Sequence, residues 1–126
     1  GTTREKHGYA FQDLLKQNGL LANGSDFPVE DINPLYGFHA AVARQDDQQY
    51  PTPGYQMENA LTRLQALKAM TIWSAYANFE EKERGSIEKG KMADFVILDA
   101  DIMQIENAKI RNTKVLSTYV GGEKLY

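Results

Sequence analysis

Gly24-Ser25-Asp26-Phe27-Pro28-Val29 directly follows a short apolar run over residues 20–22. We interpret this run as a buried strand, which places the aspartate just beyond the end of the strand. The Gly-Ser pair removes side-chain bulk where the backbone passes close to other groups, and the proline fixes the exit of the loop. The C-terminal ends of strands form the active-site face of an α/β barrel. Asp26 is therefore a candidate catalytic residue, and the alternative is that its carboxylate caps the next turn.

A second informative stretch spans residues 84–99 and reads Arg-Gly-Ser-Ile-Glu-Lys-Gly-Lys-Met-Ala-Asp-Phe-Val-Ile-Leu-Asp. Together with the first stretch, it resembles the C-terminal part of the amidohydrolase superfamily, in its amidohydrolase-3 branch. Proteins of this branch are metal-dependent hydrolases with a (β/α)8 barrel and a small β-sandwich domain. The resemblance is carried by a Gly-Ser-Asp-x-Pro-Val strand end, a Thr-x-x-x-Ala helix, a Gly-Ser-Ile-x-x-Gly-Lys-x-Ala-Asp turn and strand, and a closing Val-Gly-Gly, at residues 24–29, 71–75, 85–94 and 120–122.

The length of the chain limits what it can be. It has 126 residues, whereas a barrel of this kind needs about 250. We therefore expect a C-terminal piece of a longer protein, of α/β class. The resemblance assigns residues 2–82 to the end of the TIM-like barrel, meaning its last strand and the helices that follow, and residues 83–126 to the C-terminal strands of the composite β-sandwich domain.

The composition is that of an ordinary globular domain. Hydrophobic residues make up 42% of the chain and charged residues 25%, with a net charge of -3 and no cysteine. A chain of this kind can form a core and has no basic patch for nucleic acid. No apolar run approaches the roughly 20 residues that span a bilayer. We therefore expect neither nucleic acid nor a membrane as a partner, and no disulfide or thiolate chemistry; the compartment is left open.

Apolar spacing and stop signals predict the local structure. Helices are expected over residues 4–18, 34–42, 57–70 and 71–79, with an exposed loop over residues 46–54. Strands are expected over residues 20–23, 95–98, 115–120 and 123–126, the last two joined by a Gly-Gly turn. Because residues 95–98 are apolar on both faces, we expect that strand to be covered on both sides.

The chemistry that the resemblance implies can be carried over to one residue. In this superfamily, metal is held by a His-x-His pair after the first strand, a Lys or acidic ligand after the fourth, histidines after the fifth and sixth, and an aspartate after the eighth. Asp26 matches the last of these. The resemblance implies that Asp26 is a metal ligand and a general base and acid for hydrolysis of an amide-like C–N bond. It also implies one or two divalent ions, with zinc expected, in the longer protein. Ser25 and Phe27 are candidate residues of the substrate pocket, and for Ser25 the alternative is that it only forms the turn.

The rest of such a site is absent from this sequence. The two histidines, His7 and His39, do not form a His-x-His pair, and their positions on expected helices argue for surface or packing roles. Catalytic zinc sites use about three protein ligands. We therefore expect that the isolated chain neither binds metal tightly nor hydrolyses a substrate. The alternative is a non-catalytic amidohydrolase-like module with a structural or interaction role.

A false match occurs at residues 85–91, where the spacing up to the lysine is that of a phosphate-binding loop. Met92 stands where that loop needs a hydroxyl, and the segment opens a strand instead of a helix. We expect Lys91 to be solvated and the segment not to bind nucleotide.

A piece cut from a barrel leaves a strand edge and apolar helix faces without partners. The edge expected here lies at residues 20–23. We therefore expect a homo-oligomer, a dimer or larger.

Overall fold

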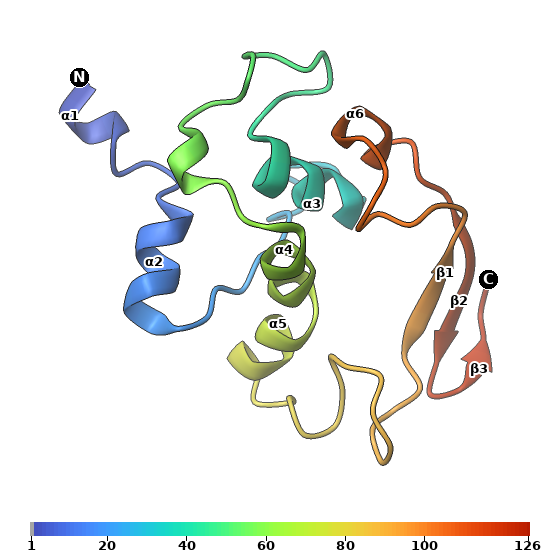
Figure 1. The fold of residues 1–126 in the computed structure, drawn as a ribbon. Coiled ribbons are helices and arrows are strands. Elements are labelled where there is room, and N and C mark those ends of the chain that lie inside the picture. Colours follow the sequence, from blue (N-terminus) through green and yellow to red (C-terminus); the bar gives the residue numbers. More distant parts are fainter. Residues whose placement is uncertain (1) are drawn as a thin grey trace.

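The computed structural model describes residues 2–126. Figure 1 shows the helices on one side and a small sheet on the other, near the C-terminus. In chain order the elements are α1 (Thr2–Glu5), α2 (Phe11–Asn18), α3 (Pro34–Ala43), the 3-10 helix η1 (Met57–Asn59), α4 (Arg63–Met70), α5 (Ile72–Ala77), β1 (Phe95–Leu98), α6 (Asn107–Ile110), β2 (Val115–Val120) and β3 (Glu123–Lys124). The architecture is mixed α/β with a small antiparallel sheet, which confirms the class expected from the sequence.

The central helix α3 has clear start and stop signals, and it confirms the helix predicted over residues 34–42. The Asn33 side chain accepts a hydrogen bond from the Leu35 N–H at 3.0 Å, and Pro34 opens the first turn. Arg44 ends the helix in the left-handed conformation, at φ 56°.

Two of the predicted helices are broken in the structure. The helix expected over residues 4–18 divides into α1 and α2, because Gly8 and Tyr9 lie in a turn and Tyr9 has a φ of 54°. The helix expected over residues 57–70 begins only at Arg63, after η1, and a capping box between Thr62 and Gln65 marks its start.

The core forms where α3 and α4 pack together under the segment that joins β1 to β2. That segment crosses back to the helices, so Ile102 and Ile110 lie in the same cluster as α3 and α4 residues (the other buried members are Leu35, Phe38, Ala41, Leu61, Ala66 and Ala69). The Arg63 guanidinium donates to the carbonyl oxygens of Ile102 and Ile105 and, at 2.8 Å, to Asn107 Oδ1. These contacts connect α4 to the segment between β1 and β2.

The sheet has the order β1-β2-β3, with both pairs antiparallel. Phe95 lies opposite Tyr119 and their rings stack at a centroid distance of 4.6 Å. The predicted Gly-Gly hairpin is confirmed, with Gly121 and Gly122 both at positive φ. The expectation that residues 95–98 are covered on both faces is wrong for this chain, because Val96 and Ile97 are 51% and 44% exposed. Of this strand, Leu98 packs against the helical core. Association with a second copy stays a prediction.

The strand predicted at residues 20–23 is not present as a strand. These residues lie outside every helix and strand of the structure. A strand requires a neighbour to complete its ladder, and the one sheet in the part of the chain that is described is formed by β1, β2 and β3. Asn23 instead donates its N–H to the Ala69 carbonyl at 3.0 Å. The assignment of residues 2–82 to a barrel and 83–126 to a composite domain stays a prediction.

Residues 2–126 include no helix that combines the length and the apolar character needed to cross a membrane.

Candidate functional site

Asp26 opens an exposed turn that spans residues 26–29. Its backbone carbonyl accepts a hydrogen bond from the Val29 N–H at 2.8 Å, and its φ is 55°. Aspartate is one of the few residues with a side chain that tolerates this left-handed conformation. The turn therefore carries an exposed carboxylate.

The carboxylate of Asp26, like that of Asp47, differs from those of most aspartates in the described chain. Within residues 2–126 it has no hydrogen-bond or ion-pair partner, whereas several other aspartates accept backbone N–H groups at 2.7 to 2.9 Å: Asp31 from Asn33, Asp46 from Gln48 and Tyr50, Asp94 from Gly121, Asp99 from Lys114, and Asp101 from Met103. A carboxylate that caps a turn is used in this way. The contacts of Asp26 thus give no support to the turn-cap alternative.

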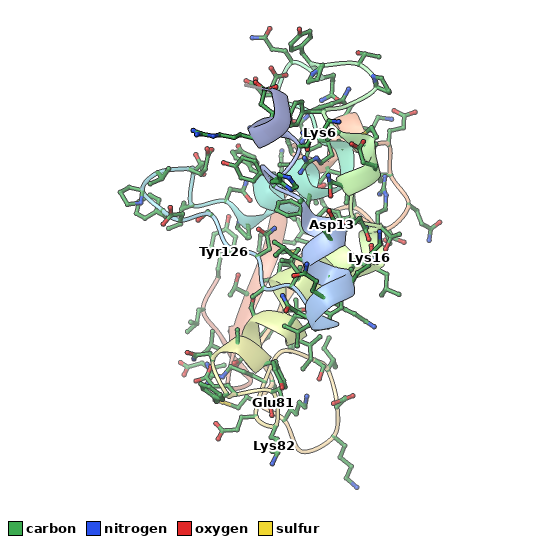
Figure 2. All side chains as sticks on the ribbon, turned by 90° about the vertical axis from the view of Figure 1, so that its left-hand side faces the viewer. Lys6, Asp13, Lys16, Glu81, Lys82 and Tyr126 are labelled. Carbon is green, nitrogen blue, oxygen red and sulfur yellow. The ribbon has the colours of Figure 1, made fainter. Side chains whose placement is uncertain are left out.

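The neighbours of Asp26 include the other two candidate site residues. Ser25 is half-buried, and Phe27 is 60% exposed. Val29 and Ile32 are also exposed, at 74% and 70%, so three apolar side chains project from one loop. Figure 2 shows this pale blue loop extending away from the helices. The assignment of Ser25 and Phe27 to a substrate pocket stays a prediction.

The described residues provide no complete metal site. No group of three or more histidine, cysteine, aspartate or glutamate side chains in this part of the chain could hold an ion. The assignment of Asp26 as a metal ligand stays a prediction.

The two histidines have the roles that their sequence positions predict. His7 is exposed in the turn after α1, and His39 is fully buried on α3, at 0% exposure. Neither ring nitrogen of His39 has a hydrogen-bond partner among the described residues. Burial lowers the pKa of His39, the positive charge of Arg111 lowers it further, and Asp46 opposes the shift. The neutral form of His39 is therefore favoured in the folded chain.

We expect His39 to make the chain less stable in mild acid. Its pKa in the unfolded chain is about 6.5 and its folded pKa is lower, so below about pH 6.5 the unfolded state binds more protons. The free energy of unfolding should then fall as the pH falls, by up to about 1.4 kcal/mol per pH unit. Urea unfolding between about pH 7 and pH 5 should show this loss in wild type and in His7→Gln. His39→Phe lacks this titrating group, so its free energy of unfolding should not show this part of the fall. Equal pH dependence of the unfolding free energy in all three proteins would contradict the prediction.

The turn that superficially matches a phosphate loop has its lysine engaged. Lys91 Nζ lies 2.6 Å from Ser86 Oγ and 3.1 Å from Glu88 Oε2, and its side chain is only 13% exposed. The prediction that Lys91 is solvated is therefore wrong, because these two partners hold it against the turn. Hydrogen bonds from Lys91 and then Ser86 lower the pKa of Glu88. A lysine neutralised in this way is not available to a phosphate.

Arg44 is an anchoring residue that no sequence motif predicts. It is 8% exposed, and its Nε donates to the Tyr55 carbonyl at 2.9 Å while Nη1 donates to the Tyr9 carbonyl at 3.3 Å. Its guanidinium also lies over the Phe11 ring at 5.2 Å. Arg44 thus joins α2 to both ends of the loop at residues 46–54, a contact between distant segments that no local motif signals.

Comparison with known proteins identifies the class. The sequence matches the amidohydrolase family over residues 1–126, and the chain belongs to this family. It is 43% identical over 125 residues to the protein LONG AFTER FAR-RED 3 of Arabidopsis thaliana, covering 96% of this chain and 20% of that protein. It is 35% identical over 118 residues to the N-substituted formamide deformylase of Arthrobacter pascens, covering 94% of this chain and 21% of that protein.

A solved structure agrees with the fold. The crystal structure of an amidohydrolase from Thermotoga maritima MSB8 aligns with a TM-score of 0.61 and 24% identity, over 94% of this chain and 26% of that one. At this identity the likeness concerns the fold alone. The chain spans about a fifth of the length of the curated relatives given above.

Proposed function

We propose that this chain is the C-terminal part of a longer metal-dependent hydrolase that acts on carbon–nitrogen bonds other than peptide bonds. Membership of the amidohydrolase family supports a hydrolase, and the name of the Arthrobacter relative supports an N-substituted amide as the class of substrate. The observation that carries the proposal is the exposed carboxylate of Asp26, which no described residue engages and which stands in the Gly-Ser-Asp-x-Pro-Val motif.

Asp26 performs the proton transfers in this proposal. One or two divalent ions, with zinc expected, would activate the scissile carbonyl when bound, and Asp26 would be one ligand. An Asp26 Oδ atom takes a proton from the attacking water as its oxygen bonds to the carbonyl carbon. The same atom returns that proton to the nitrogen as the C–N bond breaks, so the products are an acid and an amine.

The neighbouring residues supply the walls of the site in this proposal. Phe27 offers an apolar surface beside the carboxylate, and the half-buried Ser25 shapes the turn on its other side. The specificity loops beyond these two residues lie elsewhere in the longer protein.

The test compares the longer protein with the 126-residue chain. We expect the longer protein to contain zinc and to hydrolyse an N-substituted formamide, and the isolated chain to do neither. Metal analysis measures the zinc content of the longer protein, and amine release measures its hydrolysis of the formamide. Calorimetry with zinc measures the zinc affinity of the isolated chain. Submicromolar zinc affinity of the isolated chain would contradict the expected incomplete site, and a metal-free, inactive longer protein would favour a non-catalytic module.

A further inference from the structure

The backbone of Asn23 is fixed to the end of a distant helix. Its N–H donates to the carbonyl of Ala69 at 3.0 Å. Ala69 lies in the last turn of α4, where carbonyl groups lack helical partners. The chain departs from helical geometry at Thr71, with φ -128° and ψ -99°, and α5 begins immediately after it. The bond from Asn23 therefore satisfies a carbonyl that this interruption exposes.

Ser74 on α5 completes the connection. Its hydroxyl donates to the Ala69 carbonyl at 2.7 Å and lies 3.4 Å from the Asn23 carbonyl oxygen, so its one hydrogen is shared unequally. Ser74 is half-buried, which reduces competition from water. Asn23, Ala69 and Ser74 thus form one hydrogen-bonded junction among three segments, which we call the Asn23 anchor.

The residue after the anchor provides no packing of its own. A methyl group at Gly24 would meet no atom within 4 Å, and the turn that begins at Asp26 is exposed. Among the described residues, Gly24 and Ser25 make no backbone hydrogen bond, so the Asn23 anchor is the last backbone hydrogen bond before Asp26.

We propose that Ser74 is a positioning residue for Asp26, because its hydroxyl joins the end of α4 to the Asn23 backbone and so holds the segment that carries the Asp26 carboxylate. This inference rests on the proposed function of Asp26 as a metal ligand. Groups that orient a metal ligand usually affect metal affinity by about 10-fold to 100-fold. Ser74 acts through two intervening residues, Gly24 and Ser25, so we expect an effect near the lower limit, about 10-fold.

Thr71 provides a matched control. Its Oγ1 donates to the Leu67 carbonyl at 2.6 Å, also at the end of α4. This hydroxyl closes the same helix end without a bond to Asn23. A purely structural role for Ser74 predicts that Ser74→Ala and Thr71→Ala behave alike.

The experiment uses the longer protein, with the variants Ser74→Ala, Ser74→Thr, Thr71→Ala and Asp26→Asn. Zinc dissociation constants are measured by competition with a chelator, and hydrogen exchange is followed in a peptide that covers residues 20–27. Ser74→Ala should weaken zinc binding about 10-fold and speed exchange at Asn23. Ser74→Thr keeps the hydroxyl and should retain the wild-type zinc affinity and the wild-type exchange at Asn23. Thr71→Ala should change neither property.

The outcomes separate this inference from the proposed function. If Asp26→Asn weakens zinc binding but Ser74→Ala leaves zinc binding and Asn23 exchange as in wild type, the positioning role is wrong while the function stands. Equal effects of Ser74→Ala and Thr71→Ala on zinc affinity and on Asn23 exchange would also overturn the positioning role of Ser74. If Asp26→Asn leaves zinc affinity unchanged, the proposed function itself fails, and the inference fails with it.

Discussion

Replacement of Asp26 by Asn should lower the turnover of the longer protein by about 10²-fold to 10⁴-fold, the usual contribution of a general base. An amide of the same shape cannot accept the proton of the attacking water. The fold should not change, because the Asp26 carboxylate has no partner within the described chain and Asn tolerates a φ of 55° as well as Asp does. Amine release at saturating substrate measures the loss, and a thermal melt verifies that the protein remains folded.

Asp31→Asn is the matched control for this prediction. Asp31 lies in the same exposed loop, and the substitution removes the same charge. Its carboxylate accepts the Asn33 N–H at 2.8 Å, a bond that an amide oxygen can also accept. We expect near wild-type turnover. Equal losses in the two variants would indicate an effect of loop charge, and full turnover of Asp26→Asn would exclude Asp26 as the base.

The parts of the fold that the sequence predicts well are those decided locally. Asn33 and Pro34 specify the start of α3 within one turn, and the Gly121-Gly122 pair specifies the hairpin between β2 and β3. The interruption at Gly8 and Tyr9 was not predicted, because the apolar spacing continues across it.

The errors concern features that depend on distant partners. The segment at residues 20–23 is apolar enough for a strand, yet it has no neighbouring strand in the described chain. Val96 and Ile97 are exposed because no described layer covers them. The burial of Ile102 and Ile110 follows from a crossing of the chain over α3 and α4, which apolar spacing does not reveal.

The candidate site also has one part that a contiguous motif predicts and one part that depends on distant residues. The motif around Asp26 could be recognised from contiguous residues, and the structure adds that its carboxylate is free of local bonds. The Asn23 anchor could not be recognised, because Ser74 is 51 residues from Asn23 in sequence. The sequence position of a helical serine does not predict which carbonyl groups its hydroxyl will contact in the fold.

Gly85→Ala should lower the free energy of unfolding of the chain by about 2–5 kcal/mol. Gly85 has a φ of +89°, and a Cβ there would lie 2.7 Å from Ala75 Cβ and 2.9 Å from Ile72 Cα. The left-handed backbone contributes about 1–2 kcal/mol, and displacement of a packed helix adds about 1–3 kcal/mol. Urea unfolding followed by circular dichroism measures the loss.

Gly90→Ala separates the two contributions, because Gly90 has a similar φ of +96° but no atom within 4 Å of its Cβ position. It should lose only the backbone part, about 1–2 kcal/mol. Equal losses of unfolding free energy at Gly85 and Gly90 would show that α5 moves at little cost to accommodate the added methyl group. A larger loss at Gly85 would mean that the first glycine of the Gly-Ser-Ile motif is required for contact with α5, and α5 is the helix that places Ser74 beside Asn23. The motif would then contribute to the geometry of Asp26 through packing, without being part of the site itself.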